Sequence, residues 1–295
     1  MGRGDNKTAV KKDRIILVHG ACHGAWCWHK MVARLASEGH TVSAIDLTGS
    51  GIDTRKIPED VAYFSVYAKQ LMDLMASLST GEQVVLVGHS FGGLALALAM
   101  ESFPEKIAVA VFLTAFMPDT TSPPSHVLNK IDLSKLMDTE LKTLVVPEKA
   151  EPVTTMLFGP EFMAKSLYQL CSPEVIKFTR RSSQKLCNVI NINGQDLALG
   201  KSLVRVTSLF LEDLSKMPAF TEERYGSVPK VYIVCGRDEA ISVEYQRWMI
   251  QRTPVKEVME IEGADHMAML SSPVELFRCL ARIVDKYGRT MPCTI

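Results

Sequence analysis

The sequence predicts an α/β fold in which a mostly parallel central sheet carries helices on both faces and an inserted lid covers one edge. Two observations lead to this prediction. Short, almost continuous apolar runs alternate with segments of helical periodicity up to about residue 119, as in parallel sheets buried on both faces. The alternation then stops and resumes near residue 230. With 295 residues, of which 47% are hydrophobic, the chain can bury one large core and carry an insertion.

The central prediction concerns residues 84–100, which read VVLVGHSFGGLALALAM. The run of β-branched and apolar residues 84–87 ends at Gly88, and a run of small, apolar, helix-forming residues begins after Gly93. This is a strand, a sharp turn and a helix, with the pattern G-x-S-x-G at the turn. A serine on such a turn adopts a strained backbone conformation and presents its hydroxyl at the carboxyl end of the strand. Ser90 is therefore the predicted nucleophile.

The remaining elements follow from the apolar pattern in chain order. Buried strands are expected at 14–18, 41–47, 107–113, 230–234 and 256–261, and helices at 28–37, 63–79, 94–100 and 273–287.

The domain organisation follows from where this pattern is interrupted. Residues 14–119 and 228–288 are expected to form the core, with tails at 1–13 and 289–295. Residues 120–227 contain scattered prolines and short helical pieces, and are expected to form a lid over the carboxyl edge of the sheet, where open α/β sheets bind ligands. A second independent domain is the alternative, but the return of the sheet pattern favours an insertion.

A serine nucleophile needs a base, and the base needs an orienting acid. Asp238 follows the strand at 230–234, and His266 follows the last strand. The order Ser90, Asp238, His266 is the chain order of a nucleophile, acid and base on this kind of sheet. Asp119 and Glu239 are weaker candidates for the acid.

Asp265 and His19 are not expected to belong to the triad. Asp265 is adjacent to His266 in sequence and therefore badly placed to orient its ring, and His19 is expected to shape a loop.

Backbone N–H groups should form an oxyanion hole. Phe91, directly after the serine, supplies one, and Ala21, in the loop after the first strand, supplies the other.

Composition excludes several other classes of protein. Lys and Arg balance Asp and Glu, so no basic surface indicates nucleic acid binding. The seven cysteines are scattered without metal-binding spacing, which favours reduced thiols in a cytoplasmic protein. No metal or organic cofactor is expected. The polar N-terminus lacks the apolar segment of a signal peptide, and no apolar run is long enough to span a membrane.

Several segments together resemble the plant methylesterase and hydroxynitrile lyase family of α/β-hydrolases over residues 14–287. Three of them are VHGACHGAWCWHK, LVGHSFGG and IEGADHMAMLSSP. The resemblance implies an α/β-hydrolase fold, a triad of Ser90, Asp238 and His266, and an oxyanion hole at Ala21 and Phe91. It implies methyl esters of small plant metabolites or hormones as substrates, and a homodimer.

The resemblance also implies a substrate pocket at Gly20, His89, Leu136 and Met267. Lyases carry threonine at the position of Gly20 and lysine at that of Met267. This chain has neither, which favours an esterase over a lyase; a ligand-binding receptor without turnover remains the other alternative. Relatives that favour methyl salicylate carry tryptophan near the match to Leu136, so methyl jasmonate and methyl indole-acetate stay open beside methyl salicylate.

The sequence departs from the family at residues 175–195, VIKFTRRSSQKLCNVININGQ. This segment has no helical or strand period and interrupts what should be one lid helix. Valine codons begin with GT and one glutamine codon is CAG, which are the two ends of an intron. The segment is interpreted as a retained intron in the gene model, with a natural lid insertion as the alternative.

Overall fold

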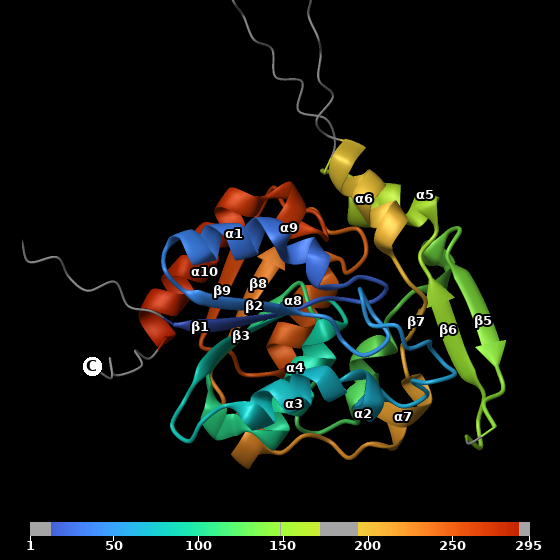
Figure 1. Ribbon diagram of the computed structural model, residues 1–295, viewed down its shortest axis with the longest axis horizontal. Coiled ribbons are helices and arrows are strands. Elements are labelled where there is room, and N and C mark those ends of the chain that lie inside the picture. The colour runs from blue at the N-terminus through green and yellow to red at the C-terminus, as the bar shows by residue number, and fades with distance from the viewer. Residues whose placement is uncertain (1–12, 148, 172–193, 289–295) are drawn as a thin grey trace, which may run out of the picture.

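The computed structural model describes residues 13–147, 149–171 and 194–288, and places six strands in one sheet (Figure 1). In spatial order these are β2 (Thr41–Ile45), β1 (Arg14–Val18), β3 (Val84–His89), β4 (Ile107–Leu113), β8 (Lys230–Cys235) and β9 (Glu257–Ile261). Every neighbouring pair in this order is parallel. The predicted fold class is confirmed.

Helices cover both faces of this sheet (Figure 1). Helices α1 (His29–Ser37) and α10 (Pro273–Tyr287) pack on one face. Helices α3 (Lys69–Ser77), α4 (Gly92–Ser102) and α8 (Val243–Arg252) pack on the other.

Successive side chains of a strand point to opposite faces, and both faces are buried here. In β1, Ile15 and Leu17 belong to one core, and Ile16 and Val18 to the other. This is why the strands read as continuous apolar runs rather than as alternating patterns.

The helix expected at 63–79 is divided in two, α2 (Phe64–Tyr67) and α3, because the carbonyl of Tyr67 accepts a hydrogen bond from the backbone of Thr48. Helix α8 was not predicted. Short helices complete the core at Ala25–Trp28, Pro104–Lys106 and Ala268–Ser271 (α9).

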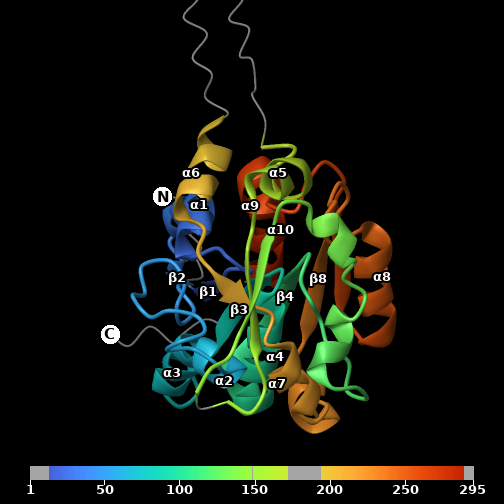
Figure 2. The ribbon, with the colours of Figure 1, turned by 90° about the vertical axis from the view of Figure 1, so that its right-hand side faces the viewer.

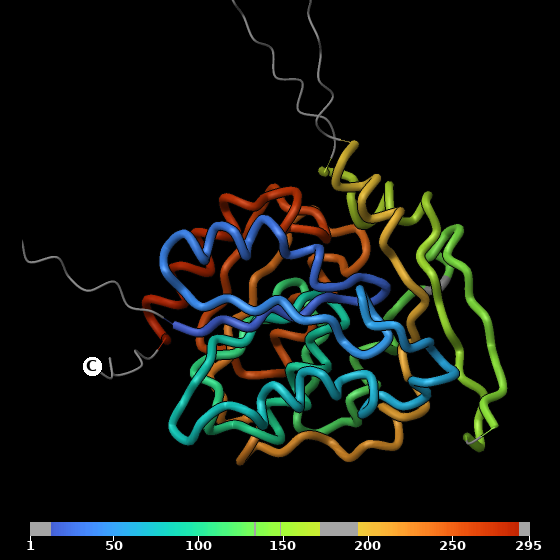
Figure 3. The backbone as a smooth tube through the Cα atoms, viewed as in Figure 1, coloured from blue at the N-terminus to red at the C-terminus, as the bar shows by residue number. Residues whose placement is uncertain are grey.

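Residues 120–227 leave the sheet after β4 and return at β8 (Figure 3). They contain an antiparallel sheet of β5 (Glu140–Leu144), β6 (Val153–Leu157) and β7 (Thr207–Ser208). Figure 2 shows these strands in front of the central sheet. The helices are Pro124–Leu128, Leu133–Leu136, α5 (Pro160–Phe162), Met163–Leu167, α6 (Gln195–Leu203), α7 (Leu211–Lys216) and Glu222–Gly226.

Short helices were expected in this region and are present, whereas the small sheet was not predicted. All five residues of β5 are exposed, so the strand has no alternation of apolar and polar positions that would reveal it.

The N-terminal tail is shorter than expected, and most of segment 175–195 lies outside the described residues. Asp13, assigned to the N-terminal tail, is 4% exposed, and its carbonyl accepts a hydrogen bond from the backbone of Thr41. Of the unusual segment 175–195, residues 175–193 lie outside the described residues, and Gln195 begins α6. Within the described residues, no helix is both long enough and apolar enough to cross a bilayer.

Candidate active site

Ser90 lies on the turn between β3 and α4 with a positive φ of 54°. This left-handed conformation is rare outside glycine and marks backbone strain. Gly92 allows the turn, because a Cβ atom there would lie 2.5 Å from the carbonyl oxygen of His19. The serine is 8% exposed.

Asp238 and His266 come from the loops after β8 and β9 and meet directly. Nδ1 of His266 lies 2.7 Å from Oδ2 of Asp238. The other carboxylate oxygen accepts two backbone N–H groups, from Ala240 and Ile241, each at 2.8 Å. Because the carboxylate faces Nδ1, the neutral imidazole carries its proton there and keeps the lone pair on Nε2.

Thr114 makes a contact with Asp238 that was not predicted from the sequence. Its hydroxyl donates to Oδ2 of Asp238 at 2.5 Å, the same oxygen that faces His266. The carboxylate of Asp238 therefore accepts four hydrogen bonds in a nearly solvent-free position. Thr114 follows β4 with a φ of 35°, and neither its residue type nor its spacing marks it in the sequence.

Ser90 and His266 line one cavity of about 60 Å³, here called the site cavity. Ala21 and Phe91, the expected oxyanion residues, line it too. The remaining lining is apolar: Phe116, Ile131, Leu136, Met156, Phe158, Phe162, Leu167, Leu209, Ala240 and Ile241. The structure thus brings together the serine, the histidine and both expected N–H residues, with Asp238 against the histidine.

Residues 20–23 form the candidate oxyanion loop. A Cβ atom on Gly20 would lie 2.7 Å from Cβ of Ser90, so the absence of a side chain lets this loop approach the serine. Cys22 has a φ of 61°. Nδ1 of His23 lies 2.8 Å from the carbonyl oxygen of Ala21, and since a carbonyl only accepts, Nδ1 carries the proton.

The other nitrogen of His23 links this loop to the lid region. Nε2 lies 2.7 Å from the hydroxyl of Tyr168, which must donate to it. Burial lowers the pKa of His23 to about 3, against a weaker opposite effect of the Ala21 hydrogen bond, so the ring is neutral. This pair was not predicted from the sequence, although the histidine lies within the family-like stretch 18–30.

Of the two weaker acid candidates, Asp119 is engaged with other partners and Glu239 is exposed. Burial alone would raise the pKa of Asp119, but hydrogen bonds from the backbone and hydroxyl of Thr121 and from Arg252 lower it to about 2. Its Oδ2 pairs with Arg252 at 2.6 Å.

Asp265 serves its own loop and the lid region. Its oxygens accept the backbone N–H groups of Met267 at 3.0 Å and Leu170 at 2.9 Å, and the hydroxyl of Ser271 at 2.6 Å. Burial raises its pKa. Asp265 does not contact the ring of His266 through any of these bonds.

His19 shapes a loop, as expected. Its Nδ1 donates to the carbonyl of Gly20 at 2.7 Å, and its Nε2 accepts the backbone N–H of Leu47 at 3.0 Å. Both nitrogens are thus occupied by backbone groups.

Of the four residues expected in the substrate pocket, the described lining of the site cavity includes Leu136 but not Gly20, His89 or Met267. His89 is buried behind the site, where its Nε2 donates to the carbonyl of His266 at 2.8 Å. Burial holds its pKa well below the ordinary value. Met267 is fully buried in the core beneath α1 and α10. Both residues therefore support the loop of His266 from behind.

Comparison with known proteins places the chain in a family. A model of the alpha/beta hydrolase family matches residues 15–278. The chain is 49% identical to "Salicylic acid-binding protein 2" of Nicotiana tabacum, over 92% of this chain and 97% of that protein. It is 47% identical to "Methylesterase 3" of Arabidopsis thaliana, over 94% and 98% of the two chains.

Solved structures give the same result. The crystal structure of polyneuridine aldehyde esterase superposes with a TM-score of 0.82 at 41% identity, covering 93% of this chain and all of the other. The match spans both the central sheet and the lid region. The chain therefore belongs to the alpha/beta hydrolase family and, within it, to the group that contains the plant methylesterases.

Proposed function

We propose that this protein is a carboxylic ester hydrolase that cleaves methyl esters of small plant metabolites or hormones, with Ser90 as nucleophile, His266 as base and Asp238 as orienting acid. The observation that carries the proposal is the 2.7 Å hydrogen bond between Asp238 and the Nδ1 of His266, with His266 and Ser90 lining one cavity. Asp238 fixes the imidazole tautomer and stabilises the imidazolium that forms during turnover.

The reaction proceeds as two acyl transfers. His266 accepts the hydroxyl proton of Ser90 while the serine oxygen attacks the ester carbonyl carbon. The bond to the methoxy oxygen then breaks, and methanol leaves with the proton from His266. Water, activated by the same imidazole, attacks the acyl-enzyme and releases the free acid and Ser90.

The backbone N–H groups of Ala21 and Phe91 are proposed to stabilise the negative oxygen of each tetrahedral intermediate. Both residues line the site cavity beside Ser90. Loss of one such donor typically costs about a hundredfold or more in rate. The hydrogen bond from His23 to the carbonyl of Ala21 supports this role, because it restrains the peptide plane next to the donor.

The substrate class is proposed from the cavity lining and the relatives. Apart from Ser90 and His266 the lining is apolar, which suits the uncharged ester of an apolar acid. Relatives named methylesterases act on methyl esters by name. Methyl jasmonate, methyl indole-acetate and methyl salicylate are the candidate substrates, and Leu136 in place of a tryptophan weakens the case for salicylate.

Two alternatives remain distinct. A receptor that binds a small acid without turnover is favoured by the name of the tobacco relative, "Salicylic acid-binding protein 2". A hydroxynitrile lyase is disfavoured, because Gly20 supplies no hydroxyl and Met267 supplies no charge to a leaving cyanide.

Methanol release from the three methyl esters, with mandelonitrile cleavage in the same panel, tests the proposal. We expect turnover of at least one ester and none of mandelonitrile. Ser90→Ala should keep binding but lower kcat by several orders of magnitude. Binding of an acid without any methanol release favours the receptor, and near-normal turnover by the serine variant contradicts the triad.

Three further properties belong to this proposal. Residues 120–227 act as a lid on a core of 14–119 and 228–288. The protein works in the cytoplasm, which agrees with the free thiols of Cys22, Cys27, Cys171, Cys235 and Cys279. It forms a homodimer, as the family resemblance implies; light scattering on the purified protein tests this, and a monomer mass contradicts it.

A further inference from the structure

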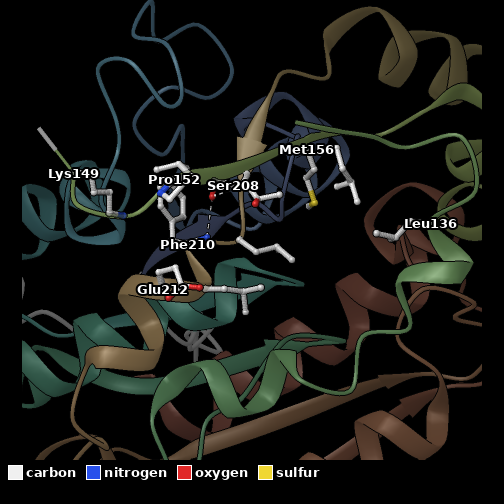
Figure 4. A pocket seen from close by; sticks show the side chains of 12 residues that line it. Leu136, Lys149, Pro152, Met156, Ser208, Phe210 and Glu212 are labelled. Carbon is white, nitrogen blue, oxygen red and sulfur yellow. Dashed lines mark hydrogen bonds between the residues drawn. The ribbon is translucent and has the colours of Figure 1, made fainter. Parts of the chain in front are cut away.

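A second cavity lies under the small sheet of the lid region, beside the site cavity. It has a volume of about 230 Å³ and is here called the lid cavity. Its walls come from β5, β6, the segment after β7 and the start of α7 (Figure 4). In Figure 4, Met156 and Leu136 lie toward one end and Lys149 toward the other. Nothing in the proposed mechanism uses this space.

Three side chains border both cavities: Leu136, Met156 and Leu209. The two spaces are therefore neighbours that share a wall of flexible side chains. Met156 is unbranched and adopts several shapes at low cost, and Leu136 and Leu209 are only half-buried. A chain that extends from Ser90 would have to pass these residues to reach the lid cavity.

The polar groups of the lid cavity are largely committed to the protein itself. The ammonium of Lys149 pairs with Asp213 at 2.7 Å and donates to the carbonyl of Ala62 at 2.8 Å. The hydroxyl of Ser208 donates to the carbonyl of Thr154 and accepts the backbone N–H of Phe210. Glu212, which is exposed, also borders the cavity, and its negative charge would repel an anionic ligand. The rest of the lining offers a ligand mainly apolar contact.

We propose that the lid cavity binds the distal, apolar part of the acyl group while the ester carbonyl lies at Ser90. This inference rests on the proposed function and narrows its substrate class to methyl esters of acids that carry a flexible apolar chain. The site cavity alone, at about 60 Å³, is small, and the larger neighbouring space adjoins its apolar side. A compact planar acyl group would leave that space unused.

A chain-length series of methyl esters, from butyrate through hexanoate to octanoate, tests the proposal with the wild-type protein. Each buried methylene contributes about 0.8 kcal/mol, so kcat/KM should rise by up to about fourfold for each added methylene until the lid cavity is full. A profile that is flat or falls from butyrate onward overturns the inference.

Two matched variants locate the effect in the lid cavity. Leu141 lines it, whereas Leu144, on the same strand, does not. The two are similarly exposed, at 45% and 39%. We expect Leu141→Trp to lower the ratio of kcat/KM for methyl octanoate to that for methyl butyrate at least tenfold. Leu144→Trp should keep the wild-type ratio. Equal ratios in both variants contradict the proposal.

Binding separates this inference from the proposed function. In the Ser90→Ala protein, calorimetric titration with the free acids should show tighter binding of octanoic acid than of butyric acid. The additional Leu141→Trp substitution should remove that difference. If the wild-type protein hydrolyses no methyl ester, the proposed function fails, and this titration still decides the lid cavity. Equal affinities for the two acids in the Ser90→Ala protein overturn the lid-cavity proposal.

Discussion

The hydroxyl of Thr114 and the imidazole of His266 share one oxygen of Asp238. The carboxylate sits between them with its second oxygen fixed by the backbone of Ala240 and Ile241. Its orientation toward the histidine is thus set by neighbours in the segments that follow two strands, β4 and β8. Loss of one donor should shift this orientation without removing any of the proposed catalytic groups.

Thr114→Val tests this relationship. Valine keeps the branched shape and removes the hydroxyl, and a hydrogen bond to a charged group contributes about 1.5–3 kcal/mol. We expect kcat to fall about tenfold or more with KM little changed, as steady-state kinetics on a methyl ester will measure. Thr114→Ser, which keeps the hydroxyl, should retain most of the activity. Unchanged kcat in the valine variant removes Thr114 from the positioning of Asp238.

Tyr168→Phe tests the link between the lid region and the candidate oxyanion loop. The change leaves Nε2 of His23 without the hydroxyl that donates to it, so the loop that carries Ala21 should lose definition. We expect a several-fold loss in kcat. Tyr225→Phe is the control, because Tyr225 is equally buried and its hydroxyl donates to the carbonyl of Pro118 at 2.7 Å, away from the site cavity. An equal kcat loss in both variants indicates general destabilisation instead.

Stability should fall as the pH is lowered from 7.5 to 5.5. Burial lowers the pKa values of His19, His23 and His89. In the unfolded chain these histidines bind protons near pH 6.5, whereas in the folded state they stay neutral to lower pH. Their contribution to the free energy of unfolding is therefore present above that pH and is lost progressively below it. Each such residue contributes a slope of up to about 1.4 kcal/mol per pH unit.

The raised pKa of Asp265 has the opposite effect on the pH dependence of stability, because the folded state binds that proton more readily than the unfolded chain does. Asp265 contributes one proton, whereas the three histidines contribute three. Urea unfolding at the two pH values measures the slope. His23→Asn should make this slope shallower, whatever its effect on absolute stability. A slope that is identical in the His23 variant contradicts a buried neutral histidine.

Leu136→Trp should shift specificity. The residue borders both cavities, so a larger side chain narrows the passage between them and supplies a flat wall to the site cavity. We expect the ratio of kcat/KM for methyl salicylate to that for methyl jasmonate to rise. Competition between the two esters measures the ratio directly, and a fall in it contradicts the role given to Leu136.

Transcripts decide the status of residues 175–195. If the segment is a retained intron, most reads across this region will join the codon of Glu174 directly to that of Asp196. Reads that all include the segment establish a natural insertion. The shortened protein, made in parallel, should hydrolyse the same esters, because Ser90, Asp238 and His266 all lie outside the segment.

Much of the fold was predictable because its signals are local. A parallel strand buried on both faces reads as an apolar run, and β1 and β4 have the predicted bounds. The turn at Ser90 was predictable because glycine is needed where Gly92 approaches the carbonyl of His19. The strands of the lid region gave no such signal, since β5 is exposed along its whole length.

The sequence by itself determined the strand order along the chain, the strained serine and the edge of the sheet where aspartate and histidine follow their strands. These depend on backbone periodicity and on residues close in sequence. Only the tertiary structure decided that Thr114 meets Asp238, that Tyr168 meets His23, that His89 and Met267 lie behind the site, and that a second cavity adjoins the first. Those contacts join residues far apart in the chain, and side-chain packing, which has no period, selects them.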